Sequence, residues 1–314
     1  MGVTHRRGLA STGSSAVRRP TIVAIDAPTT GARLSGSRRW ASLALVAPAV
    51  AIAAFVVVGG IGMSVVQSVG LLPLVGEAAF SLDAYVANGD ELVTGIGLSL
   101  GIATASTVLS CLIGLTAAVI ITQGRRTGRI VAAVSALTIP VPHLIGAASI
   151  GLLLSDAGIL PRILGISGAE WPDIVGGAWW VAVVLEYTWK ESAFVALVVA
   201  AVLSSRVARY DETAALLGAS RARRLRHVVI PLARPAVIVS AIIIFVYTFG
   251  SYEVAWLLGR PYPEPLPVLA FRLFDSVSLT SRPEAAAVAV VTTIISLLVV
   301  ALGMALLRRT PLWK

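Results

Sequence analysis

The sequence predicts an all-α membrane protein that crosses the bilayer six times. Hydrophobic residues make up 57% of the 314 residues and charged residues only 13%, whereas soluble domains carry roughly 25% charged residues. Six apolar runs are each long enough for the ~20 residues that cross a bilayer as a helix. Basic residues gather in alternate connecting segments, as they do on the inner side of membrane proteins. These three observations indicate that lipid is the solvent for most of this chain.

The positions of the runs divide the chain into five parts. Residues 1–39 are rich in Ser, Gly, Thr and Arg without an apolar period, which predicts a disordered cytoplasmic tail. Residues 40–69 are expected to stay as the first transmembrane helix, because a signal peptide has a shorter tail and an apolar region of only ~7–15 residues. An outer loop at 70–91 leads into a five-helix core at 92–307. A short cytoplasmic tail, 308–314, ends the chain.

The five-helix core is predicted from five further apolar runs. Glycine and proline recur inside them, which helices in lipid tolerate better than helices in water. The stretch PVPH, Pro140 to His143, is interpreted as a kink and not as a ligand site. The runs are 92–122, 130–154, 174–203, 235–258 and 285–307.

The distribution of charge predicts the orientation. With an inside N-terminus, the inside segments hold 20 of the 25 basic residues, while ten of the 16 acids lie outside. Because basic residues favour the cytoplasmic side, both termini are expected in the cytoplasm. The net charge of +9 therefore reflects topology, and it gives little reason to expect nucleic-acid binding. The inside segments are 1–39, 123–129, 204–234 and 308–314.

The inside segment 204–234 is unusually charged and patterned. Its apolar positions between Ala214 and Ala219 favour a short helix that Gly218 can end, with Ser204, Ser205 or Asp211 as the N-cap. A second helix is expected from Ser220, and Pro231 and Pro235 should interrupt its hydrogen-bond ladder. The result is a compact helical projection with small residues at its tip. On charge alone, a solvated loop that is basic only because of its side of the membrane is the favoured interpretation.

The spacing within this segment resembles a known signature. Glu212, Thr213 and Ala214, then Gly218, then Val228, Ile230 and Pro231 stand in register. This pattern is similar to the E-A-A, G, nine residues, I-x-L-P signature of binding-protein-dependent ABC transporter permeases. Thr213 replaces the first Ala, Val228 the Ile and Ile230 the Leu. Stretches such as LSLGIATASTVLSCLIGLTAAVIIT and TWKESAFVALVVAAVL extend the resemblance over about residues 80–305. FGSYEVAWLLGRPYPEPLPVLAFRLF looks closer to the polyamine-, iron- or thiamine-type branch than to sugar-type permeases.

The resemblance implies the permease subunit of an ABC importer in a bacterial cell membrane. Its partners would be a dimer of ATPase subunits, a second permease subunit of the same or another kind, and an extracytoplasmic solute-binding protein. The segment 204–234 would contain a coupling helix that docks into a cleft of the ATPase and transmits its opening and closing. Nearby arginines could add charge attraction or serve only as topology markers. The residues this implies for coupling are Glu212, Ala214, Ala215, Gly218, Ala219, Arg221 and Pro231.

The chain itself carries no recognisable ATP chemistry. A phosphate-binding loop of the Walker A type needs a lysine after glycine-rich backbone, and neither Lys190 nor Lys314, the only lysines, follows a glycine. The three histidines, His5, His143 and His227, are scattered, so no metal site is expected. The sequence therefore predicts a transport subunit that is no enzyme and binds no cofactor, with ATP and Mg²⁺ on the partner ATPase.

Ionisable residues inside the apolar runs are candidates for the translocation path, because lipid makes them costly. Glu186 and Lys190 stand four residues apart, so they either neutralise each other and support helix packing, or one acid such as Glu191 faces a water-filled path. Tyr247, Ser251 and Glu253 lie near the outer end of the fifth run, where an aromatic belt would explain the tyrosine alone. A secondary transporter or channel without an ATPase partner is the alternative function, although the inverted repeats that many such transporters show are not evident.

Overall fold

The computed structural model describes residues 36–122, 124–166 and 168–309. Of the predicted tails at 1–39 and 308–314, residues 1–35 and 310–314 lie outside this part, whereas 36–39 and 308 are helical. Within the described helices, the side chains of 36–43, 205–209, 211–212 and 215 are also left out. All regular structure in the described part is helical, and six helical stretches there are long and apolar enough to cross a membrane, which confirms the predicted fold class.

The chain divides into two compact units, Met1–Ala54 and Phe55–Lys314. The division falls inside the first helix, α1 (Gly36–Ser68), whose candidate span is Ala44–Ser68. In the second unit, the end of α1 is tied to the short helix α2 (Asp83–Val86) by a 2.8 Å hydrogen bond between the hydroxyls of Ser68 and Tyr85.

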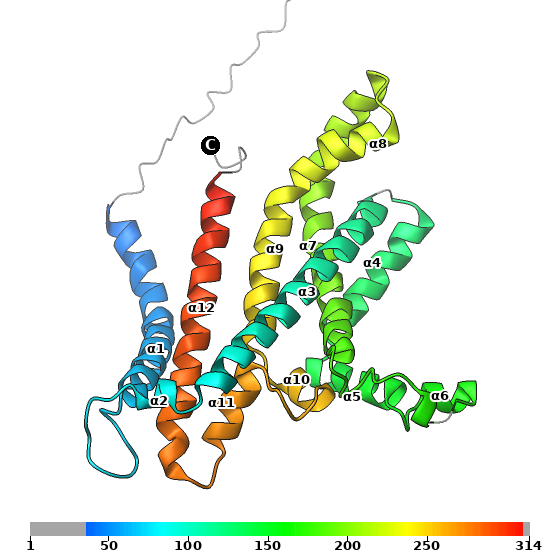
Figure 1. Ribbon diagram of the computed structural model, residues 1–314. Coiled ribbons are helices and arrows are strands. Elements are labelled where there is room, and N and C mark those ends of the chain that lie inside the picture. The colour runs from blue at the N-terminus through cyan, green and yellow to red at the C-terminus, as the bar shows by residue number, and fades with distance from the viewer. Residues whose placement is uncertain (1–35, 123, 167, 310–314) are drawn as a thin grey trace, which may run out of the picture. The chain divides into compact units, whose positions relative to one another are not determined.

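The centre of the second unit is the crossing of α3 (Gly89–Thr122) with α7 (Val181–Leu216) (Figure 1). The backbones approach closely at Gly114, since a Cβ there would lie 2.5 Å from Val195 Cβ. Helices in lipid pack by such contacts between small residues, because no hydrophobic effect drives them together. This crossing therefore fixes the position of α7 along α3.

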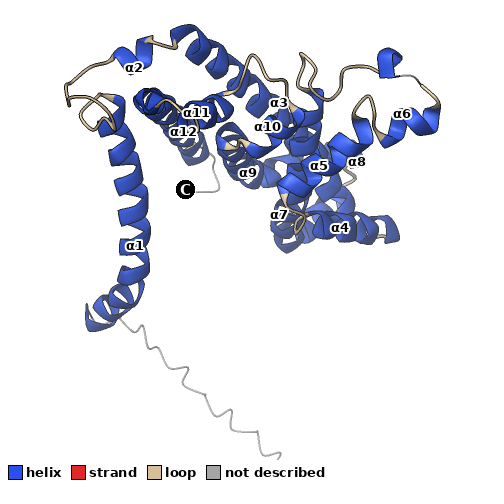
Figure 2. Cartoon of the chain, turned by 90° about the horizontal axis from the view of Figure 1, so that it is seen from below, coloured by secondary structure: helices blue, strands red, loops and turns tan. Residues whose placement is uncertain are grey.

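Two more long helices complete the bundle around this crossing. They are α9 (Ile230–Gly250), which packs on both α3 and α7, and α12 (Arg282–Arg308), which packs on α9. Figure 2 shows α11 (Leu266–Phe274) beside α12, and its backbone is also held to α3 by a 2.8 Å bond from Leu266 N to Ser99 Oγ.

The predicted kink at PVPH is a complete break in the helix. The structure has α4 (Arg126–Thr138), a turn at 139–142, then α5 (His143–Leu154) and α6 (Ile159–Leu164). The prolines prevent a continuous helix because they lack the N–H that each helical turn needs. The third candidate span accordingly lies at His143–Leu164, whereas we predicted 130–154.

The segment between α7 and α9 differs from the prediction at its start. No separate short helix begins at Ser204, Ser205 or Asp211, because α7 continues without interruption to Leu216. It ends as predicted at Gly218, whose φ of +80° suits a residue without a Cβ, and Ala219 N closes the helix with a 3.0 Å bond to Ala214 O.

The second helix of this segment begins after Ser220, as predicted, and Ser220 is its N-cap. It comprises α8 (Arg221–Arg224) and a wide π-turn at Leu225–Val229 that runs directly into α9. Pro231 cannot donate a backbone hydrogen bond. The π-turn before it widens the backbone hydrogen-bond ladder, so the helix continues past this proline. In Figure 1 this projection lies on the same side as the α3–α4 connection and the end of α12.

Candidate functional site

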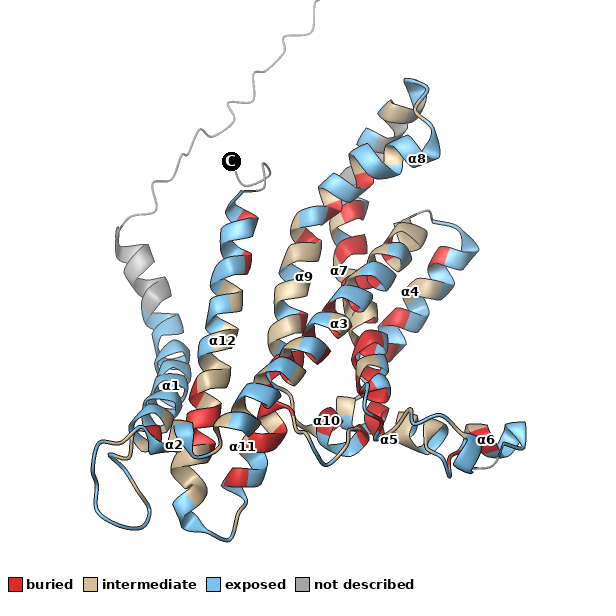
Figure 3. Cartoon of the chain, viewed as in Figure 1, coloured by how far each residue is buried: buried red, intermediate tan, exposed pale blue. Residues whose placement is uncertain are grey.

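The segment Leu216–Arg224, called here the projecting turn, stands away from the rest of the second unit (Figure 3). Leu216 and Leu217 expose 89% and 83% of their surface, and a Cβ at Gly218 would meet nothing within 4 Å. Two large apolar side chains beside a bare glycine, at the end of a charged segment, form a surface suited to a protein partner.

The structure places the proposed coupling residues at or near this turn. Ala214 and Ala219 are half-buried and form the hydrogen bond that closes α7, whereas Arg221 and Pro231 are exposed. The backbones of Glu212 and Ala215 lie in the last turns of α7, but their side chains are outside the described part of the chain. The structure thus gathers the described coupling candidates on one projection, except Pro231, which lies in the first turn of α9.

A second group of polar side chains lies deep in the bundle and is called here the His143 cluster: His143, Glu186, Tyr187, Glu191 and Tyr247. His143 Nδ1 lies 3.1 and 3.2 Å from the two carboxylate oxygens of Glu186, which is fully buried. His143 Nε2 lies 3.4 Å from Glu191 Oε1. The imidazole is thus held between two carboxylates that both come from α7.

Two tyrosines complete the His143 cluster. The Tyr247 and Tyr187 rings have centroids 4.8 and 5.9 Å from that of His143. Tyr187 is almost fully buried, while Tyr247 keeps 38% of its surface exposed. The cluster therefore joins α5, α7 and α9 and reaches the bundle surface at Tyr247.

The expected ion pair between Glu186 and Lys190 is wrong, because each side chain has other partners in the described part of the chain. Lys190 Nζ donates hydrogen bonds to the carbonyl oxygens of Thr138 at 2.9 Å and Ile139 at 3.3 Å, and also to that of Val141. Glu186 pairs with His143 instead. Spacing along one helix could not reveal this, because both partners lie on the broken segment α4–α5.

The remaining path candidates follow α9. Ser251 and Glu253 are half-buried at the junction of α9 with α10 (Glu253–Leu258). Ser251 lines a cavity of about 10 Å³ together with Tyr187 and Thr248. A space of that size holds about one water molecule and no solute.

His143 is the residue that the sequence interpretation missed. It was assigned to a kink because proline surrounds it, yet an ionisable side chain in an apolar run was a usable signal. Its two partners are five residues apart on α7, so neither is identifiable from the PVPH stretch alone.

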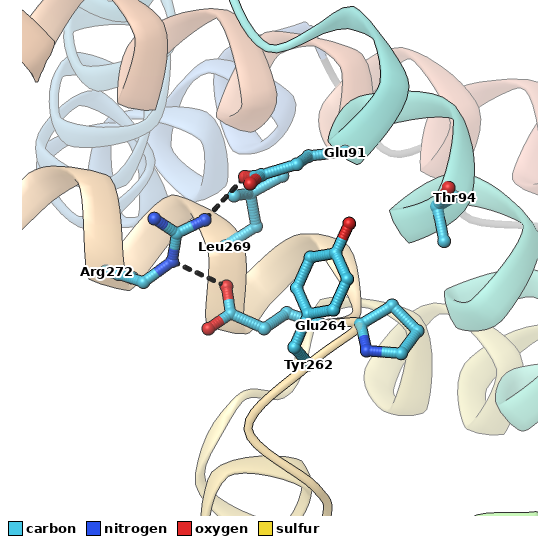
Figure 4. A pocket seen from close by; sticks show the side chains of 7 residues that line it. Glu91, Thr94, Tyr262, Glu264, Leu269 and Arg272 are labelled. Carbon is cyan, nitrogen blue, oxygen red and sulfur yellow. Dashed lines mark hydrogen bonds and ion pairs between the residues drawn. The ribbon is translucent and has the colours of Figure 1, made fainter. Parts of the chain in front are cut away.

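The opposite end of the second unit carries an ion triad (Figure 4). Arg272 of α11 lies 2.5 Å from Glu91 of α3 and 2.8 Å from Glu264. The hydrogen bond to Glu264 is the main cause of a raised pKa for the Arg272 guanidinium, so this residue stays charged. The cavity beside it is also only about 10 Å³, so the triad ties α11 to α3 and encloses no solute site.

Comparison with known proteins gives a consistent result. Residues 110–310 match the family described as the binding-protein-dependent transport system inner membrane component. A sulfate transport system permease protein from Salmonella typhimurium is 25% identical over 214 residues, which cover 68% of this chain and 76% of that protein. A sulfoquinovosyl glycerol transport system permease protein from Agrobacterium fabrum is 26% identical over 147 residues, 46% of this chain and 47% of that protein.

Solved structures show the same fold. A bacterial ABC transporter involved in the import of the acidic polysaccharide alginate has a chain that superposes with a TM-score of 0.68 at 19% identity, covering 88% of this chain and 97% of that one. A methionine ABC transporter in an inward-facing conformation gives 0.57 at 19% identity, covering 71% and 98%. An amino acid ABC transporter gives 0.54 at 18% identity, covering 74% and 99%.

Proposed function

This chain belongs to the family of binding-protein-dependent transport system inner membrane components and is the permease subunit of an ABC importer, and we propose that a separate ATPase drives it through the projecting turn. The observation that carries this proposal is the exposure of Leu216 and Leu217 around Gly218. Leucines of this exposure are costly in water unless a partner covers them. Family membership also favours this mechanism over a secondary transporter or channel without an ATPase.

The projecting turn is assigned to the cytoplasmic side. The turn, the α3–α4 connection and the end of α12 share one side of the second unit, and all three segments are rich in arginine. Basic residues favour the cytoplasm. Both termini then lie in the cytoplasm, and the membrane is the inner or plasma membrane of a bacterial cell.

ATP and Mg²⁺ are assigned to the ATPase, and this chain contributes no catalytic residue and binds no cofactor. Its part is mechanical: Glu212, Ala214, Ala215, Gly218, Ala219 and Arg221 present a docking surface, and Pro231 sets where α9 starts. Arginine side chains on α8 would add attraction to an acidic cleft, although such exposed pairs contribute little.

The solute path is assigned to the face where the His143 cluster reaches the surface at Tyr247, continuing to Ser251 and Glu253. Both cavities described above hold about one water each. The path is therefore proposed to form between this chain and a second permease subunit. The side opposite the projecting turn would receive an extracytoplasmic solute-binding protein.

The solute itself is proposed only by class. Ten of the 16 acids fall in outer segments under this topology. That excess would attract a cationic solute, as in the polyamine-type branch, or would dock the binding protein electrostatically. A ligand-binding screen on the partner binding protein decides between the two, since the binding protein selects the solute before the permease receives it.

A crosslinking experiment tests the docking proposal. A photoreactive phenylalanine analogue replaces Leu217, and the chain is co-expressed with the ATPase encoded beside it. Illumination should give a covalent adduct with the ATPase. The matched control places the analogue at Val277, a fully exposed residue between α11 and α12, and should give none. No adduct at Leu217, or equal adducts at both positions, would overturn the assignment.

A further inference from the structure

The break between α4 and α5 leaves backbone carbonyls without their helical donors. Thr138 O would normally accept from the N–H four residues on, but residue 142 is a proline, and the carbonyl accepts only from Val141 N at 3.2 Å in the turn. Pro140 removes a second donor within the same turn. In lipid no water replaces the missing donors, so the remaining acceptor positions of these carbonyls must be filled from inside the protein.

Lys190 supplies those donors. Its ammonium contacts three carbonyls of the break, those of Thr138, Ile139 and Val141, and an ammonium has three N–H groups to give. Lys190 is 6% exposed, so the contacts are sheltered from solvent. Its positive charge also lies at the C-terminal end of α4, where the helix dipole is negative.

The other side of the break is held by the opposite charge. Glu186, one turn before Lys190 on α7, accepts from His143 in the first turn of α5, where the helix dipole is positive. Gly146 makes room for this carboxylate, since a Cβ there would lie 2.9 Å from Glu186 Oε1. The helix α7 thus holds both sides of the break. Its Lys190 carries a positive charge at the negative end of the α4 dipole, and its Glu186 carries a negative charge at the positive end of the α5 dipole.

The same helix connects the break to the projecting turn. The backbone of α7 is helical from Val181 to Leu216 without interruption, so a displacement at one end is carried to the other. We propose that Lys190 is a positioning residue of the transport cycle, which fixes the α4–α5 break to α7 and so lets movement of the projecting turn reposition His143 beside Tyr247. This inference rests on the proposed docking of an ATPase at the turn.

The attachment of the α4–α5 break to Lys190 can be tested independently of transport. Spin labels on cysteines at Ile130 of α4 and Leu152 of α5, both exposed, report the geometry of the break in the assembled importer. Cys111, the only cysteine, is first replaced by serine. The distance distribution should be narrow with Lys190 and with Lys190→Arg, but broad with Lys190→Met. A narrow distance distribution for Lys190→Met would show that Lys190 does not hold the break in place.

Transport measurements then separate positioning from mere stability. Lys190→Met should lower ATP-driven uptake more than about tenfold, the scale expected when a positioning contact is lost, while ATP hydrolysis continues. Lys190→Arg should restore uptake. Arg162→Met, which removes a cation from α6, should leave uptake unchanged.

A second variant covers the case in which Lys190→Met fails to fold. Adding Pro142→Ala supplies a further N–H for the carbonyls of the break, so the double variant should recover folded protein but not uptake, because the α4 side of the break is no longer tied to α7. Recovery of uptake in the double variant would show that Lys190 only satisfies carbonyls, and would overturn the proposal. A wild-type importer without ATP-driven uptake would instead refute the proposed function. The spin-label result would then still test whether Lys190 holds the break.

Discussion

The two ends of α7 differ in what they bury. Near its start, Glu186, Tyr187 and Lys190 are charged or polar and almost fully buried. At its end, Leu216 and the adjoining Leu217 are apolar and almost fully exposed. The polar end finds all its ionic partners on the same chain, so its chemistry serves the internal geometry of the subunit. The apolar end is left uncovered by the described part of the chain, which is the pattern of a surface completed by another protein.

Two glycines show the same contrast. A side chain at Gly114 would collide with Val195 on α7, whereas one at Gly218 would meet no neighbour. At Gly114 the constraint is contact with another helix, and at Gly218 it is only the positive φ. Substitutions at the two positions should therefore fail in different ways.

The largest effect is expected at the helix crossing. Gly114→Val places a branched side chain where the Cβ alone lies 2.5 Å from Val195 Cβ. Overpacking of this kind should destabilise the bundle by about 3 kcal/mol or more, seen as a large loss of folded protein in thermal unfolding. Gly101→Val on the same helix, with nothing within 4 Å, is the control and should remain folded. Equal stability of the two variants would mean that α3 and α7 do not cross closely.

Removal of the buried carboxylate should come next. Glu186→Ala leaves His143 without its closest partner and should cost about 2–3 kcal/mol of unfolding free energy. Glu253→Ala should leave stability nearly unchanged and reduce solute uptake instead. Thermal unfolding and uptake, measured on both variants, check this. A Glu253 variant that loses stability and uptake together would be structural.

The glycine of the projecting turn should affect function more than stability. Gly218→Val forces a branched residue into the left-handed region, at a cost of about 1–2 kcal/mol, and should abolish ATP-driven uptake while membrane insertion persists. Gly218→Asn is the control, because asparagine tolerates this conformation, and should retain uptake. Unchanged uptake with valine would show that the turn geometry does not matter for coupling.

The smallest effect on stability is expected at the exposed leucine. Leu217→Asp should change the unfolding free energy by less than about 0.5 kcal/mol, since the residue is 83% exposed, yet co-purification of the ATPase should fall sharply. Val277→Asp at the opposite side provides the comparison and should leave co-purification intact.

Features that depend on neighbours in sequence were predictable. Run length identified six crossings, and Gly218 marked the end of α7, because hydropathy and positive φ are local properties. The predicted caps at Ser204, Ser205 and Asp211 were wrong, because α7 runs through all three positions and Ser204 Oγ donates back to the carbonyl of Ala201 within the helix.

Features that depend on contacts between helices were not predictable. The i, i+4 spacing of Glu186 and Lys190 suggested a pair, but the broken segment offered each residue a better partner. Proline at 140 and 142 announced a kink, and only the fold shows which side chain compensates for it. The coupling and path assignments themselves stay predictions.

The helical crossing at Gly114 has a mechanical consequence. If α7 stays straight and rocks about Val195, the projecting turn lies about 32 Å from that fulcrum and Glu186 about 14 Å from it on the other side, at 1.5 Å per residue. The helix is then a lever with arms in a ratio of about two to one. A displacement of the projecting turn in one direction would move Glu186 about half as far in the opposite direction, with a correspondingly greater force.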